Sequence, residues 1–202
     1  MTDSTAAHEG PSDPGGTVGG SIPLPPAGVD APCGMDAADV PLKLNILGAL
    51  TLDFKGGINV RVRTSMAEGL VLEIQGFRME ADTSPSTPGV GTLVALAMSN
   101  ASLTPLSVLR TTTADGLEML LHLSLTVEVI DKATGETIST LATDPTKYAT
   151  LRATNLTSFP PVDQLCTLQE PVQLYASQGG TVQMDNPAGE LQDFDVTVSQ
   201  SA

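Results

Sequence analysis

The chain contains no tryptophan, and aromatic residues make up only 3% of its 202 residues. A folded core must therefore be built from aliphatic side chains, without the large aromatic anchors that dominate many protein interfaces. Basic residues are also scarce, because 9 lysines and arginines stand against 23 aspartates and glutamates, which gives a net charge of −14. This charge repels nucleic-acid phosphates and anionic membrane surfaces, so no nucleic-acid partner is expected.

Signals that would direct the chain to a membrane are missing as well. No run of eighteen apolar residues occurs, so no membrane span is expected. Residues 1–10 contain neither a basic stretch nor an apolar stretch, which predicts no signal peptide and a cytoplasmic location, without excluding export. We interpret the Lys-poor, Thr-rich composition as bacterial.

Two cysteines are too few for a disulfide-rich fold or a cysteine-based metal site. Cys33 and Cys166 have similar surroundings, because each follows a Pro-Pro pair and then a Val-Asp pair. A Cys33–Cys166 disulfide would close a long loop and would contribute about 5 kcal/mol in the chain-entropy account. The alternative is two free thiols in a reducing cytosol.

Composition divides the chain into two parts. Residues 1–39 contain six prolines, seven glycines and few large apolar residues, so they cannot offset the entropy cost of folding. We predict a disordered, acidic N-terminal arm over residues 1–39 and a single antiparallel β domain over residues 40–202.

Two long stretches alternate apolar and polar residues, the pattern of a half-buried β-strand. They cover residues 42–54, with Gly48 in one apolar position, and residues 119–129. After the first stretch, Lys55-Gly56-Gly57 and later Ala67-Glu68-Gly69 have the length and glycine of hairpin loops. At Gly76 the apolar positions change from even to odd numbers, which predicts a bulge in the strand.

A shared Asp-x-x-x-Gly-Glu pattern at residues 131–136 and 185–190 predicts two further hairpin turns. The sequence predicts no helix and about nine or ten strands of unusual length. The expected fold is all-β: an elongated antiparallel β-sandwich preceded by the arm. A half-open β-barrel is the alternative, because it has the same sequence pattern.

Reactive side chains are few, and none forms a recognisable motif. The sequence lacks the nucleophile, zinc-protease, phosphate-loop and dinucleotide patterns, so we predict no enzyme activity, no cofactor and no metal. Arg61 and Arg63 are expected to pair with Asp53 and Glu73 across neighbouring strands. His122 is expected to be a surface or inter-sheet residue.

Two function classes remain. The first is a non-enzymatic β-module that binds an unknown protein partner or associates with itself, by strand addition if edge strands are exposed. The second is a carrier for a lipid or another apolar small molecule. Its cavity would be lined by the aliphatic strand residues Leu44, Ile46, Leu121 and Leu123.

Overall fold

The computed structural model describes residues 22, 24–66, 69–83, 91–99, 106–112 and 116–200. Within them the chain forms thirteen strands and no helix, and all strand pairs are antiparallel. The all-β antiparallel class is therefore confirmed, with more strands than the nine or ten expected. The strands are β1 (Asp30–Leu44), β2 (Gly48–Met66), β3 (Gly69–Asp82), β4 (Thr92–Met98), β5 (Ser107–Thr111), β6 (Leu117–Leu123), β7 (Leu125–Asp131), β8 (Thr137–Thr143), β9 (Ala149–Leu156), β10 (Gln164–Leu168), β11 (Val172–Gln178), β12 (Thr181–Leu191) and β13 (Val196–Gln200).

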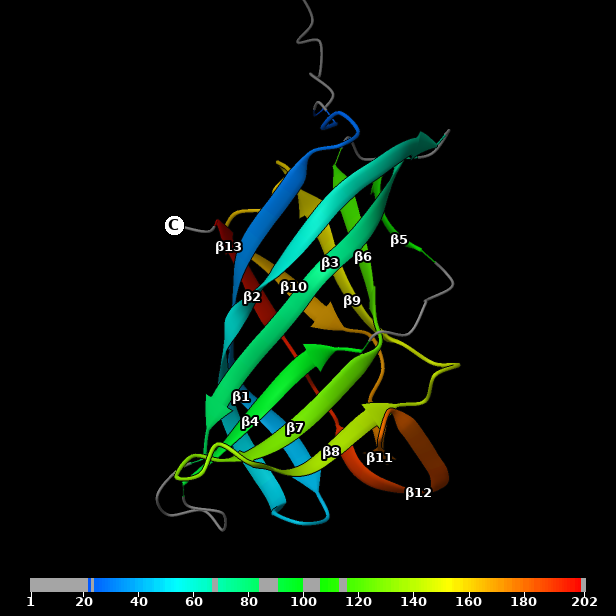
Figure 1. Cartoon of the computed structure of the whole chain (residues 1–202). Coiled ribbons are helices and arrows are strands. Elements are labelled where there is room, and N and C mark those ends of the chain that lie inside the picture. Colours follow the sequence, from blue (N-terminus) through cyan, green and yellow to red (C-terminus); the bar gives the residue numbers. More distant parts are fainter. Residues whose placement is uncertain are drawn as a thin grey trace, which may run out of the picture.

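All thirteen strands belong to one sheet, which closes on itself twice. The order is β12-β11-β8-β7-β4-β3-β2-β1-β13-β10-β9-β6-β5, and the additional pairings are β12–β1 and β3–β5. The long strands β1, β2 and β3 are therefore shared by two closed sets of eight strands, which Figure 1 shows one above the other. We call the set with β5, β6, β9, β10 and β13 the upper cylinder, and the set with β4, β7, β8, β11 and β12 the lower cylinder.

This arrangement differs from both expected ones, since the molecule is neither two separate sheets nor half open. Eight strands close around an interior just wide enough to be filled by side chains. The two ends of the strand order are paired with β1 and β3, so the described strands leave no whole strand at a sheet edge for strand addition.

The first strand begins earlier than the sequence predicted. Residues 30–39, which we had placed in the arm, form most of β1, and Ala31, Cys33 and Met35 point into the core. Their alternation is hard to see in the sequence because the side chains are small and prolines and aspartates lie between them. The rest of the predicted arm, apart from residue 22 and residues 24–29, lies outside the described residues.

The predicted strand over residues 42–54 is two strands. Its first residues end β1, a turn occupies residues 45–47, and β2 begins at Gly48, whose φ is +82°. The Gly56-Gly57 pair is not a hairpin loop, because β2 passes straight through it. A Cβ on Gly57 would lie 2.7 Å from the carbonyl oxygen of Cys33, so this glycine allows a close approach of two backbones.

The bulge predicted at Gly76 is confirmed. Gly76 pairs with Asn59 and Ile74 pairs with Val60, so Gln75 is the extra residue. The buried side chains change from even to odd positions there, as the sequence indicated. A similar shift in β1 lies between Ala37 and Val40.

At these irregularities the strands pass from one cylinder to the other, and we call this level the waist. The predicted strand over residues 119–129 also divides there, at Ser124, into β6 of the upper cylinder and β7 of the lower one. The Ser124 hydroxyl lies 2.7 Å from that of Ser99 and 3.2 Å from that of Thr143.

One of the two predicted Asp-x-x-x-Gly-Glu turns is correct. The Asp131 carboxylate accepts a hydrogen bond from the backbone N–H of Ala133, and Gly135 has a φ of +73°, as a β7–β8 hairpin requires. The second prediction is wrong, because β12 runs through residues 185–190 and its hairpin turn is at Gly179-Gly180.

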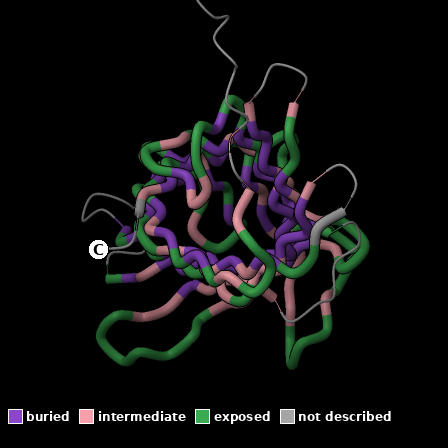
Figure 2. The backbone as a smooth tube through the Cα atoms, turned by 90° about the horizontal axis from the view of Figure 1, so that it is seen from above, coloured by how far each residue is buried: buried purple, intermediate pink, exposed green. Residues whose placement is uncertain are grey.

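The interior of both cylinders is one continuous cluster of buried, mainly aliphatic side chains. Phe54 and Phe194 meet edge to face within it, with ring centroids 6.3 Å apart. Figure 2 shows buried and exposed residues alternating along the strands. No helix in the described part of the chain is long and apolar enough to cross a membrane.

Candidate ligand-binding cleft at the waist

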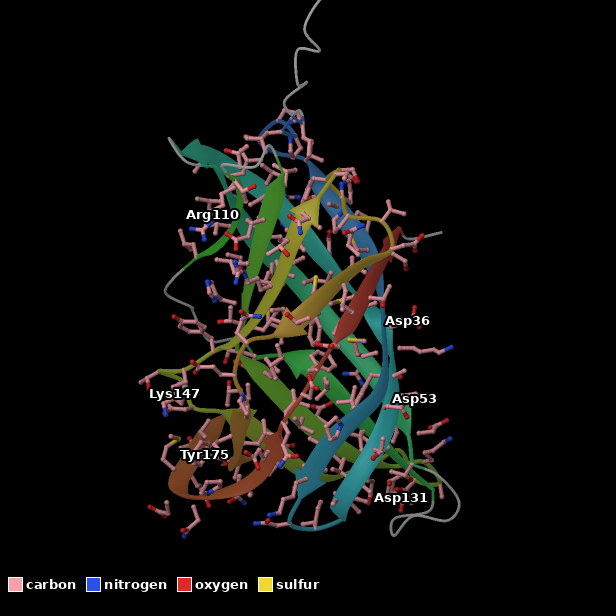
Figure 3. The ribbon with its side chains drawn as sticks, turned by 180° about the vertical axis from the view of Figure 1, so that it is seen from behind. Asp36, Asp53, Arg110, Asp131, Lys147 and Tyr175 are labelled. Atoms are coloured by element: carbon pink, nitrogen blue, oxygen red, sulfur yellow. The ribbon has the colours of Figure 1, made fainter. Side chains whose placement is uncertain are left out.

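A cleft of about 530 Å³ lies on the outer surface where two connections cross the waist side by side. One wall is the β8–β9 connection and the other is the β10–β11 connection with the start of β11. Figure 3 labels Lys147 and Tyr175, one from each wall, on the same side of the molecule. The lining residues are Thr143, Asp144, Thr146, Lys147, Tyr148, Thr150, Gln169, Glu170, Pro171, Val172, Gln173 and Tyr175.

Both tyrosines of the chain line this cleft. Tyr148 and Tyr175 are half-buried, whereas Phe54, Phe77 and Phe194 are buried in the interior. Aromatic side chains with a polar tip provide much of the contact energy at binding sites. Their concentration in one cleft of an aromatic-poor chain makes this cleft the leading candidate site.

A turn with several hydrogen bonds holds the first wall. The Asp144 carboxylate accepts hydrogen bonds from the Thr146 backbone N–H and hydroxyl, both at 2.7 Å. These bonds, the hydroxyl's first, lower the pKa of Asp144. The backbone N–H of Lys147 donates to the Asp144 carbonyl oxygen at 2.9 Å, so the turn fixes the backbone position of Lys147 and of Tyr148 after it.

The ring of Tyr148 packs against that of His122 in β6. Their ring centroids are 4.6 Å apart in an edge-to-face arrangement, and His122 Nδ1 lies 3.1 Å from the Thr150 hydroxyl. The His122 backbone N–H donates to the Ser107 hydroxyl at 2.9 Å. Burial lowers the pKa of His122, which keeps the imidazole neutral near pH 7. His122 is only 8% exposed, so of the two expected positions, surface or inter-sheet, the surface one is wrong: the Tyr148 ring packs over it.

A charged cluster joins residues of β5, β6 and β9 in the upper cylinder. Glu118 is only 4% exposed, and its carboxylate forms ion pairs with Arg110 Nε at 2.5 Å and Arg152 Nη2 at 2.6 Å. Burial acts to raise the pKa of Glu118, but the hydrogen bonds from the two arginines outweigh it and the pKa is lowered. Arg152 is two residues from Thr150 of the cleft.

The arginines that the sequence singled out lie in surface ion pairs. Arg63 pairs with Glu73 at 2.6 Å, as predicted. Arg61 instead forms two bonds with Asp30, at 2.6 and 2.7 Å, because β1 is the neighbour of β2 at this level. Asp53, the predicted partner, accepts a bond from the backbone N–H of Asp39 in the β1 bulge.

Cys33 and Cys166 are free thiols, both buried in the core. They belong to β1 and β10, and β13 lies between these strands in the sheet. Burial, with a smaller contribution from Cys33, raises the pKa of Cys166 to about 12.

The residues proposed to line an apolar cavity have two different environments. Leu44, Leu121 and Leu123 are buried members of the continuous core cluster. Ile46 lies in the β1–β2 turn and is 53% exposed, so it cannot line the interior.

Comparison with known proteins supports the fold. The sequence matches no protein-family model, and no curated protein matches it. The fold is similar to that of DynF. The structure of DynF, from the dynemicin biosynthesis pathway of Micromonospora chersina, aligns with a TM-score of 0.66 over 88% of this chain and 82% of DynF. The sequences are 13% identical, so the likeness concerns the fold alone.

Sequence reasoning did not find the cleft. The signal was present, because Tyr148 and Tyr175 are the two tyrosines of a chain without tryptophan. Their proximity depends on β8 and β11 being neighbours, which no local pattern predicts. Among the described residues, the cleft included, no group of three or more His, Cys, Asp or Glu side chains could hold a metal ion.

Proposed function

We propose that this chain is a non-catalytic binding protein and that its ligand is a small molecule held in the cleft at the waist. The observation that carries the proposal is the position of Tyr148 and Tyr175, one on each wall. The volume of about 530 Å³ is in the range of small-molecule sites, about 300–1,000 Å³.

A second depression of similar volume provides a comparison. It measures about 560 Å³ and is lined by Thr51, Leu52, Asp53, Lys55, Glu80, Ala81, Asp82 and Leu93, without an aromatic residue. Volume therefore does not distinguish the cleft, whereas its tyrosines do.

The roles of the titratable residues support binding over catalysis. Asp144 is engaged by Thr146, and His122 is turned toward Thr150 and Tyr148. Each side chain holds the cleft's own structure. DynF, which has a similar fold, comes from a biosynthesis pathway, and that setting fits a small-molecule ligand.

The absence of tryptophan makes the test direct. All tyrosine fluorescence of the protein comes from the two cleft residues. We expect titration with a chemically diverse library of sugars, aromatic acids and fatty acids to give a saturable change in tyrosine emission for at least one class. Lys147→Gln should weaken that binding, while Lys55→Gln, in the second depression, should leave it unchanged. Equal effects of the two substitutions would contradict the location.

The second candidate is a carrier of a lipid or another apolar molecule inside the cylinders. The aliphatic composition of the continuous interior favours it. A guest would have to displace packed side chains such as Leu121 and Leu123. Native mass spectrometry after incubation with palmitate tests this candidate, because a bound mass that persists in Lys147→Gln would place the guest outside the cleft.

A further inference from the structure

We propose that the ligand of the cleft at the waist is a neutral, hydroxyl-rich ring, the chemistry of a glycosyl group. This inference rests on the proposed function and specifies the class of molecule that the same cleft binds. Three properties of the lining carry it: its hydrogen-bonding capacity, its balance of charge and its two aromatic walls.

Hydrogen-bonding side chains dominate the lining. Only Pro171 and Val172, of the twelve lining residues, lack a polar side-chain group. Some of the other ten, such as Asp144, already have partners within the protein. An apolar ligand would remove the remaining polar groups from water without giving them partners, which costs free energy for each group left unpaired. The ligand must therefore carry many hydrogen-bonding groups of its own.

Both donors and acceptors are available. The amide nitrogens of Gln169 and Gln173 donate within the protein, to Thr167 and Glu190 respectively, so their amide oxygens remain as acceptors. Tyr148, Tyr175 and Thr150 carry hydroxyl groups that both donate and accept. A ligand hydroxyl has the same double capacity, so it can pair with any of these groups.

Charge in the cleft favours a neutral ligand. Asp144 and Glu170 oppose an anion, and Lys147 opposes a cation. Lys147 lies close enough to lower the pKa of Asp144, although Thr146 has the larger effect. Asp144 and Lys147 therefore partly offset one another, which leaves a small net negative charge that disfavours an anion, and each charged group can bond to a hydroxyl group of the ligand.

The tyrosines suit the apolar face of a saturated ring. A sugar ring presents C–H groups on its faces and hydroxyls around its rim, which matches aromatic walls surrounded by polar side chains. Tyr148 is already held against His122, with ring centroids 4.6 Å apart. A wall that is ordered before binding loses little conformational entropy when the ligand arrives.

The test measures tyrosine emission of the full chain during titration with methyl glycosides of glucose, galactose, mannose and rhamnose. Cyclohexanol and palmitate serve as apolar probes. We expect saturable binding of at least one glycoside and none of cyclohexanol. Tyr175→Ala should weaken this binding about tenfold or more. Gln173→Ala should weaken it several-fold, and Lys55→Gln should not change it.

Tyr175 is half-buried, so its variant needs a check of folding by far-ultraviolet circular dichroism. Gln173 is exposed, and its variant keeps the test valid if Tyr175→Ala does not fold. Binding of palmitate that Gln173→Ala weakens, without binding of any glycoside, would overturn this inference and leave the proposed function intact. If no compound of any class changed tyrosine emission, both would be wrong.

Discussion

Replacement of Gly56 by alanine tests whether β2 and β3 pass through the waist in close contact. Gly56 lies inside β2 opposite Met79 of β3. A Cβ there would overlap the carbonyl oxygen of Arg78 and lie 2.6 Å from the Cα of Met79. Both neighbours are backbone atoms, so no side chain can rotate away, and β3 must move away from β2.

We estimate the destabilisation from two contributions. Forcing extra atoms into a packed site costs about 1–3 kcal/mol. Moving β3 away also weakens about two inter-strand hydrogen bonds, at about 1 kcal/mol each. Gly56→Ala should therefore lower the free energy of unfolding by about 3–5 kcal/mol, and the melting temperature by roughly 6–20 °C for a domain of this size.

Gly76→Ala is the matched control, because Gly76 also lies in a strand at the waist. A Cβ there meets nothing within 4 Å, and its φ is not positive. Alanine reduces the freedom of the unfolded chain, so this variant should be unchanged or more stable by about 0.4–1 kcal/mol. Thermal and urea unfolding, followed by circular dichroism, would measure both. Equal stability of the two variants would refute the close crossing and favour a hairpin loop at residues 55–57.

Three further predictions concern the core and the charged cluster. Glu118→Gln should lower the free energy of unfolding by about 1–3 kcal/mol at neutral pH. The pKa of Glu118 is lowered in the folded state, so the stabilisation from its ionised carboxylate is complete above about pH 4.5 and is lost as the pH falls through the folded-state pKa. The variant should therefore lose less stability than the wild type when both are acidified. Cys33 and Cys166 should react with a thiol reagent only after the protein unfolds, because burial raises the pKa of both thiols. If the mass of the intact protein under non-reducing conditions were lower by two hydrogens, the two cysteines would form a disulfide and the prediction would be wrong. Leu123→Ala should lower the free energy of unfolding by about 2–5 kcal/mol if the interior is packed, whereas Ile46→Ala, at an exposed residue, should lower it by less than about 0.5 kcal/mol. A small effect at Leu123 would favour the carrier.

Patterns local to one strand were predicted well from the sequence. The change of parity at Gly76 gave the bulge at Gln75, because a buried face forces the register of a strand. The turn at Asp131 was also correct, since an aspartate carboxylate and a glycine with positive φ specify it locally.

The errors occurred where a local signal has two meanings. A glycine pair marks either a turn or a close approach of strands, and only the neighbours β1 and β3 decide between them at Gly56-Gly57. The arm was predicted too long because Ala31 and Cys33 are small, and because their place in the sheet depends on distant strands, β2 and β13, that pair with β1.

The sequence by itself determined the all-β class, the aliphatic core and most of the alternating faces, because these follow from the two-residue period of a strand. The closure of the sheet, the partner of Arg61 and the cleft with its two tyrosines were decided only by the tertiary structure. Each depends on which strands become neighbours. That choice is made by contacts between residues far apart in the chain, such as Tyr175 with Ala142, and no local pattern encodes it.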